Sequence, residues 1–393
     1  MANFQEPPRL RIGEDSEEER HATWLELFYD LVFVVAVSQL AHYLHDHVSL
    51  SGFLSFVVLF IPVWWSWIGT TFYSNRFDSD DVVHRLLTGV QMLAIAALAV
   101  NVHHALDENS AGFALSYALG RAVLVVEYIR AGRNIERARS LTTRSATGFA
   151  IAATLWVISA FVPIPLRFAF WALGIIVDFA TPLSARKLLR ELPPHASHLP
   201  ERFGLFTMIV LGEAIIAVVN GVSEQKWDVA TVISAVFGLS IAFSLWWVYF
   251  DNLGGTPIRR AQSEGTNATI NIWLYTHLPL VIGIAATGVA VELVLLSEPR
   301  LALPDALRWL LCGSVALCYI ALGILHSTGV IRYCKIRFKY RIGAALIVLA
   351  IAIFSKGLLP VAVIGLVAVV GGVQVVQDMY QSRPTTRLVD PQI

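Results

Sequence analysis

Two carboxylates stand one helical turn apart in the otherwise apolar stretch TWLELFYDLVFVVAVSQLAHYL. Glu26 and Asp30 are spaced i and i+4, so on a helix they share one face. Thr23 and Glu26 fit a capping box at a helix N-terminus, where acidic side chains also suit the helix dipole. Asp30 lies deeper, where a carboxylate needs a partner or water, because a charge in hydrocarbon costs about 3 kcal/mol on insertion scales. We expect Arg76 or Arg85 to be that partner.

Three more ionisable side chains, Arg121, Asp178 and Glu213, lie deep within apolar runs. Groups of both signs at such depth need internal pairing, and we expect Arg121 to pair with Glu213. Two interpretations stay open: a buried ion pair that fixes helix register, or an ion-binding or coupling site. The candidates for a substrate or ion pathway are Glu26, Asp30, Arg121, Asp178 and Glu213.

The segment NRFDSDDVVHR joins the second and third apolar runs with side chains of alternating charge. It is either a solvated charged turn or a conformational latch, in which aspartates pair with nearby arginines. The candidates for such a latch are Arg76, Asp78, Asp80, Asp81, Arg85, Glu201, Arg202 and Asp251.

Histidines gather in HYLHDH and NVHHALDE, at the ends of the first and third apolar runs. His42, His45, His103 and His104 are either polar residues of the membrane interface or ligands of a weak metal site. Neutral imidazoles bind zinc, and histidine titrates near neutral pH, so pH sensing is a further option.

The elements that must position these residues are apolar helices. Of the 393 residues, 56% are hydrophobic and only 15% are charged, against about 25% charged in soluble domains. Runs of about 18 apolar residues or more are long enough to cross a bilayer. We therefore predict an all-α polytopic membrane protein with about twelve transmembrane helices. The predicted spans are 24–44, 52–73, 83–103, 112–130, 146–163, 165–184, 203–222, 229–250, 272–296, 304–328, 341–356 and 358–378.

The distribution of positive charge predicts the orientation. Most of the 29 Lys and Arg residues fall in the tails and in every second loop, which the positive-inside rule assigns to the cytoplasm. We expect a multi-pass protein of the inner (plasma) membrane with both termini in the cytoplasm. Residues 1–20 read as a disordered acidic tail and 381–393 as a C-terminal tail.

The two halves of the chain resemble each other. ELFYDLVFVVAVSQL can be laid on ERFGLFTMIVLGEAII, and a tryptophan-rich second run follows in both halves, as WWSW and LWWVYFD. Each half holds six predicted spans, an even number, so both keep one orientation in the membrane. We predict two parallel six-helix repeats, over 21–190 and 191–380.

Several classes of function are excluded by missing patterns. The sequence has no Gly-x-Ser-x-Gly elbow, Walker loop or dinucleotide fingerprint, so we expect neither an enzyme of these classes nor a cofactor. The net charge of zero gives no basic surface for nucleic acid. The three cysteines lack the paired spacing of zinc or redox motifs.

Four segments carry a family resemblance: WLELFYDLVFVVAVSQL, NRFDSDDVVHR, ERFGLFTMIVLGEAI and LWWVYFD. Together they resemble the bacterial low temperature requirement A family over roughly residues 20–380. The resemblance implies an integral membrane protein of bacterial type and no defined substrate. The positions that match the family pattern are Glu26, Asp30, Arg76, Asp78, Asp81, Arg85, Glu201, Arg202, Glu213 and Asp251.

We expect this protein to transport a small solute or ion with the help of its intramembrane carboxylates. A channel-like ion pathway is one alternative, and a membrane-resident enzyme or structural factor acting on lipids is another. Its expected partners are the lipid bilayer and an unknown small solute or ion, with a homo-oligomer as an option.

Overall fold

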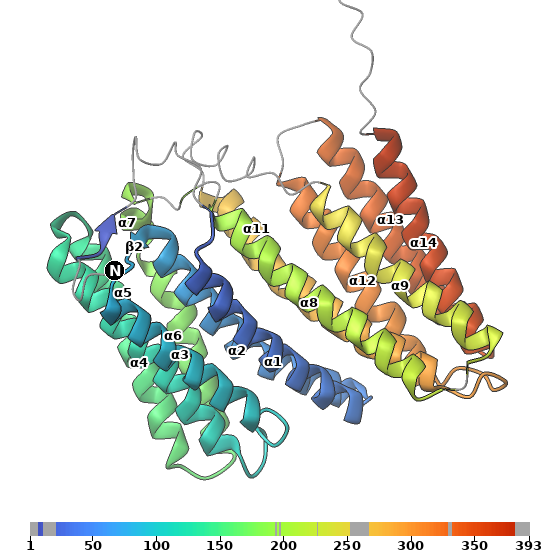
Figure 1. The fold of residues 1–393 in the computed structure, drawn as a ribbon, viewed down its shortest axis with the longest axis horizontal. Coiled ribbons are helices and arrows are strands. Elements are labelled where there is room, and N and C mark those ends of the chain that lie inside the picture. The colour runs from blue at the N-terminus through green and yellow to red at the C-terminus, as the bar shows by residue number, and fades with distance from the viewer. Residues whose placement is uncertain are drawn as a thin grey trace, which may run out of the picture.

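The computed structural model describes residues 7–10, 21–192, 195, 198–225, 227–251, 267–328 and 332–381. These residues form one bundle of long helices that lie side by side (Figure 1). The first half comprises α1 (Trp24–Asp46), α2 (Leu50–Arg76), α3 (Val82–Asn101), α4 (Ser110–Asn134), α5 (Arg139–Ala160), α6 (Leu166–Ser184) and the short α7 (Arg186–Glu191). The second half comprises α8 (His198–Ser223), α9 (Val229–Phe250), α11 (Asn267–Leu296), α12 (Asp305–Ser327), α13 (Arg332–Phe354) and α14 (Pro360–Gln381).

Each predicted apolar run falls on one long helix, which confirms an all-α fold. Within the described residues, ten helices are long and apolar enough to cross a membrane. The helices α5 and α13 are not among these ten, and both carry arginines in their first half, Arg139 and Arg144 in α5 and Arg337 and Arg341 in α13. The chain is therefore a polytopic membrane protein, with ten clear candidate spans.

The start of α1 follows the predicted capping box. The Thr23 hydroxyl accepts a hydrogen bond from the Glu26 backbone N–H at 3.2 Å, and the Glu26 carboxylate accepts one from the Thr23 N–H at 2.8 Å. Asp81 caps α3 in a similar way, and Asp228 caps α9. Polar side chains thus fix the helix starts, although the helices themselves are apolar on most faces.

The order of the helices across the bundle places α1 and α2 near its middle (Figure 1). The helices α3 to α6 pack on one side of this pair, and α8 with α11 pack on the other, followed by α9 and α12 to α14. We call the end of the bundle where α1 begins the N-side. The short helix α7 and the C-terminal end of α2 also lie at the N-side.

A two-residue strand holds part of the N-terminal segment against the bundle. Strand β1 (Arg9–Leu10) pairs antiparallel with β2 (Phe77–Asp78), directly after α2. The prediction of a disordered tail over 1–20 is therefore wrong for Arg9 and Leu10. Residues 1–6 and 11–20 lie outside the described residues, as do 382–393 of the predicted C-terminal tail.

Aromatic side chains fill the core between α1, α2 and α8. Trp67 is fully buried, and its ring lies 4.4 Å from that of Phe206. Phe33 packs on the same ring of Phe206, edge to face. This rigid apolar packing surrounds the charged side chains described next, so their positions are closely determined.

Candidate functional site

Asp30 is held by two donors from two other helices. Arg202 of α8 donates from Nη2 to Oδ1 of Asp30 at 2.8 Å, and Trp67 of α2 donates from Nε1 to the same oxygen at 2.9 Å. The side chains of Asp30 and Arg202 are 3% and 1% exposed. This buried ion pair joins the first helices of the two halves of the chain.

The prediction that Arg76 or Arg85 pairs with Asp30 is wrong. Arg76 donates from Nε to the carbonyl oxygen of Leu192 at 3.1 Å, and Arg85 pairs with Asp80 at 2.8 Å. Arg202, predicted as a latch residue, takes the place of both. It can do so because α8 lies against α1, a neighbourhood that local spacing does not reveal.

A series of hydrogen-bonded polar side chains lies one helical turn nearer the N-side than Asp30. His198 Nε2 lies 3.3 Å from a carboxylate oxygen of Glu26, and its Nδ1 lies 3.1 Å from the amide nitrogen of Asn75. The side-chain oxygen Oδ1 of Asn75 in turn accepts from the His195 backbone N–H at 2.7 Å. These contacts join α1, α2, the start of α8 and the segment before it. Sequence reasoning missed Asn75 and His198.

Arg121 pairs with Asp178, and the predicted pairing with Glu213 is wrong. Arg121 Nε lies 3.2 Å from Asp178 Oδ2, and both side chains are at most 1% exposed. Tyr117 donates its hydroxyl to the same carboxylate and accepts from Arg121 at 2.8 Å. The helices α4 and α6 supply these three residues, whereas Glu213 lies on α8.

Glu213 faces a different neighbourhood, toward the side opposite the N-side. Its carboxyl lies near Ser38 and His42 of α1. Glu292 of α11 lies near His42 and His45. Sequence reasoning missed Glu292, although it is the only acidic residue within the apolar run of α11. The five pathway candidates therefore fall into three groups: Glu26 with Asp30 on α1, Arg121 with Asp178, and Glu213 alone.

The predicted latch is several ion pairs rather than one. Asp81, which caps α3, pairs with Arg130 of α4 at 2.5 Å, and His84 pairs with Glu127 at 2.9 Å. Sequence reasoning missed these two α4 partners. Asp78 lies in β2, opposite Arg9.

Two latch candidates lie apart from this loop. A carboxylate oxygen of Glu201 accepts from the Ala22 backbone N–H at 3.3 Å, and Asp251 lies 3.9 Å from Arg337. Arg337 also lies 4.0 Å from Asp378, which forms a buried ion pair with Arg341. This third buried pair, between α13 and α14, was likewise not predicted.

Two histidines at the side of the bundle opposite the N-side lie near the carboxylate of Asp46. His45 lies 3.2 Å and His103 3.7 Å from Asp46, and the rings of His103 and His104 are 4.9 Å apart. No group of three or more His, Cys, Asp or Glu side chains within the described residues is arranged to hold a metal ion. The geometry therefore gives the predicted histidine metal site no support.

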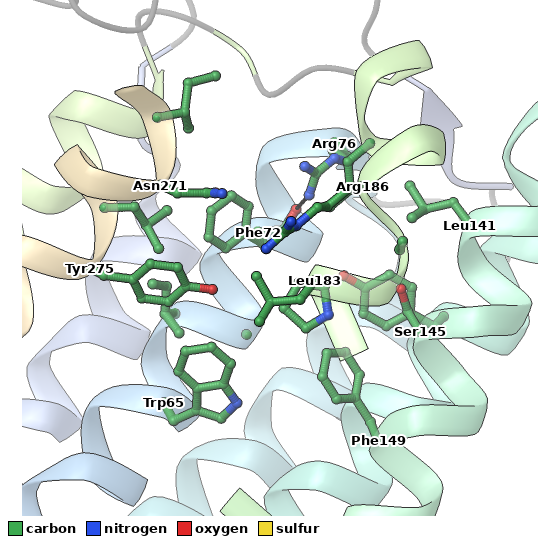
Figure 2. A pocket seen from close by; sticks show the side chains of 18 residues that line it. Trp65, Phe72, Arg76, Leu141, Ser145, Phe149, Leu183, Arg186, Asn271 and Tyr275 are labelled. Carbon is green, nitrogen blue, oxygen red and sulfur yellow. Dashed lines mark hydrogen bonds between the residues drawn. The ribbon is translucent and has the colours of Figure 1, made fainter. Parts of the chain in front are cut away.

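A cavity of about 110 Å³ opens between the two halves near the N-side (Figure 2). Residues of α2, α4, α5, α6 and α7 line it from the first half, and residues of α11 line it from the second. Arg76, Arg186 and Asn271 lie at one end, and Trp65 and Phe149 lie at the other. Sequence reasoning missed this cavity, because its walls come from six separate helices.

A comparison with protein families gives a match over most of the chain. A family model for the bacterial low temperature requirement A protein (LtrA) matches residues 21–376. An uncharacterized protein of Rhizobium meliloti (strain 1021) is 28% identical over 289 residues, which cover 71% of this chain and 70% of that protein. No solved structure matches the chain.

Proposed function

This chain belongs to the bacterial low temperature requirement A family of proteins, and we propose that it transports a small solute or ion across the membrane. The transport would use the charged residues buried between its helices. It would proceed by relative movement of the two halves of the bundle, with the N-side cavity as the point of access.

The buried pair of Asp30 and Arg202 is the observation that carries this proposal. Taking two charges out of water costs several kcal/mol per ion, and a buried pair often stabilises a fold no better than apolar residues of similar size. Charged residues inside a membrane bundle are by default functional candidates. This pair lies where α1 meets α8, so breaking and re-forming it would accompany any movement of the halves.

The repeated packing order supports a two-repeat architecture. In the first half α1 packs on α3, α3 on α4, α4 on α5 and α5 on α6; in the second half the corresponding helices α8, α11, α12, α13 and α14 pack in the same order. Transporters built from two parallel repeats bind substrate at the repeat interface. We include α5 and α13 as spans, for a total of twelve.

We further propose the inner (plasma) membrane as its location, with both termini in the cytoplasm. The excess of Lys and Arg in the N-side loops supports this orientation. The N-side cavity would then open toward the cytoplasm.

The proposal can be tested with the purified protein in proteoliposomes. Uptake would be measured for a panel of cations, short carboxylates, amino acids and protons, with Asp30→Asn as the test variant. Asp107→Asn is the matched control, because the Asp107 side chain is exposed between α3 and α4. We expect uptake of at least one solute by the parent protein and by Asp107→Asn, and its loss in Asp30→Asn. Uptake that survives Asp30→Asn unchanged would remove the pair from the mechanism.

A further inference from the structure

We propose that the N-side cavity binds a short organic anion, with its carboxylate or phosphate between Arg76 and Arg186 and its apolar part toward Trp65 and Phe149. This inference rests on the proposed transport function in one respect: it takes the bound anion to be the class of solute that the protein transports. The binding site itself stands on the chemistry of the cavity walls.

Among the buried arginines of the described residues, Arg76 differs in having no carboxylate beside its guanidinium. Five arginine side chains are buried among the described residues. Four of them lie within 4.0 Å of an aspartate: Arg121, Arg202, Arg308 and Arg341. Arg76, 5% exposed, has no carboxylate partner in the part of the chain that the structure describes. A buried charge without a partner is costly, and an anionic ligand would supply the missing carboxylate.

Among the described residues, the Arg76 guanidinium also donates only two hydrogen bonds. Its Nε donates to the Leu192 carbonyl oxygen at 3.1 Å, and its Nη1 donates to that of Phe72 at 3.4 Å. Within the described residues, its Nη2 has no partner. An arginine fixed in this way presents a donor to an anion with little further loss of side-chain entropy.

The rest of the cavity mouth is suited to the same charge. Arg186 of α7 lines the cavity beside Arg76, together with the amide of Asn271 (Figure 2). The hydroxyl of Tyr275 points toward the centre. No aspartate or glutamate is among the lining residues. Two positive charges and no negative one favour an anion over a cation or a zwitterion.

The far end of the cavity is apolar, and the cavity is small. Trp65 and Phe149 lie there, so a fully hydrated inorganic ion would lose its water without replacement. A cavity of about 150 Å³ accommodates one benzene, and this cavity has about 110 Å³. A monocarboxylate with a short hydrocarbon chain fits this volume better than a phospholipid headgroup with its acyl chains.

Equilibrium binding of butyrate to the detergent-solubilised protein tests the inference without any transport. Butanol and butylamine have the same carbon chain and serve as neutral and cationic controls. We expect butyrate to bind, and Arg76→Gln and Arg186→Gln to weaken its affinity, by about tenfold for the buried arginine. Arg144→Gln should leave the affinity unchanged, because Arg144 bonds to Ser184 outside this cavity.

A second readout separates binding from loss of structure. Arg76→Gln removes an unpaired buried charge, so we expect the ligand-free protein to melt at the same temperature or higher. Arg186 is exposed, and its variant should melt like the parent protein. Equal affinity for butyrate, butanol and butylamine would overturn the inference, and so would unchanged butyrate affinity in both variants.

A lipid headgroup carries the same anionic chemistry, and a nanodisc comparison distinguishes the two sources. We expect butyrate affinity to be equal in nanodiscs of phosphatidylcholine and in nanodiscs that also contain phosphatidylglycerol. Loss of butyrate binding only with phosphatidylglycerol would assign the cavity to lipid and overturn the inference. Butyrate binding without any flux in proteoliposomes would support the anion site and contradict the proposed transport function. Flux of other solutes without butyrate binding would support transport and contradict the anion site.

Discussion

Asp30 of α1 and Arg202 of α8 form an ion pair of 2.8 Å that is almost fully buried, although 172 residues separate them in the sequence. The pair ties the two halves of the bundle together at their first helices. Removing Arg202 alone would leave Asp30 buried without its cation. We expect Arg202→Ala to destabilise the protein by about 3–5 kcal/mol.

The double variant Asp30→Asn with Arg202→Gln keeps the shape and removes both charges. We expect it to recover most of the stability lost in Arg202→Ala, as measured by thermal unfolding in detergent. Equal destabilisation by the single and the double variant would mean that packing, rather than charge, determines the effect.

Arg121 and Asp178 provide a second test, which separates the observed pairing from the one predicted by sequence. Arg121→Ala should destabilise by about 3–5 kcal/mol, because Asp178 is then left buried without a cation. Adding Asp178→Asn should restore much of this loss, and adding Glu213→Gln should restore none. Rescue by Glu213→Gln in unfolding measurements would contradict the structure.

Gly69 explains how the Arg121 guanidinium fits against α2. A Cβ at position 69 would lie 2.5 Å from Arg121 Nη1, and that guanidinium is fixed by Asp178. We expect Gly69→Ala to cost about 1–3 kcal/mol through overpacking. Gly89→Ala in α3 is the control, because a Cβ there would meet nothing within 4 Å. A Gly69→Ala variant as stable as this control would show that Arg121 can move freely.

Glu213 lies on a different part of the proposed path, near Ser38 and His42. We expect Glu213→Gln to lower flux strongly in proteoliposomes while the protein stays folded and inserted, because the amide keeps the shape and a hydrogen-bonding group. Expression and melting temperature are measured beside the flux. Full flux in a folded Glu213→Gln variant would remove this carboxylate from the path.

The topology can be tested with reporter fusions. We expect fusions at Glu136, before α5, and at Arg337, in α13, to report the cytoplasm, because both belong to Lys- and Arg-rich parts of the predicted N-side. A periplasmic signal at either position would contradict the twelve-span count.

The helices were predictable from the sequence because each depends on local composition. The apolar runs identified every long helix, and Thr23 with Glu26 identified the start of α1. The partners of the buried charges were not predictable in this way. The Asp30 pair depends on how α1 packs on α8, and one sequence without helix-packing information leaves several arginines equally plausible.

The cavity near the N-side could not be predicted from the sequence either. Arg76 was singled out for its charge and its place in a loop, yet its position beside Arg186 and Asn271 depends on helices from both halves. Similarly, the sequence did not indicate that Glu127 and Arg130 would form ion pairs. These pairs depend on the approach of α4 to the loop after α2. Sequence patterns identified polar residues of interest, and the three-dimensional packing determined which of them meet.

The most direct measurement of the central claim is solute exchange across proteoliposomes that contain the purified protein. A labelled solute that the panel identifies is loaded inside, and its efflux is followed with and without unlabelled solute outside. We predict that efflux saturates with concentration, that outside solute accelerates it, and that Asp30→Asn abolishes both effects. A channel would give efflux that rises without saturation and gains nothing from outside solute. Either that result, or no flux of any solute in the panel, would contradict transport by this protein.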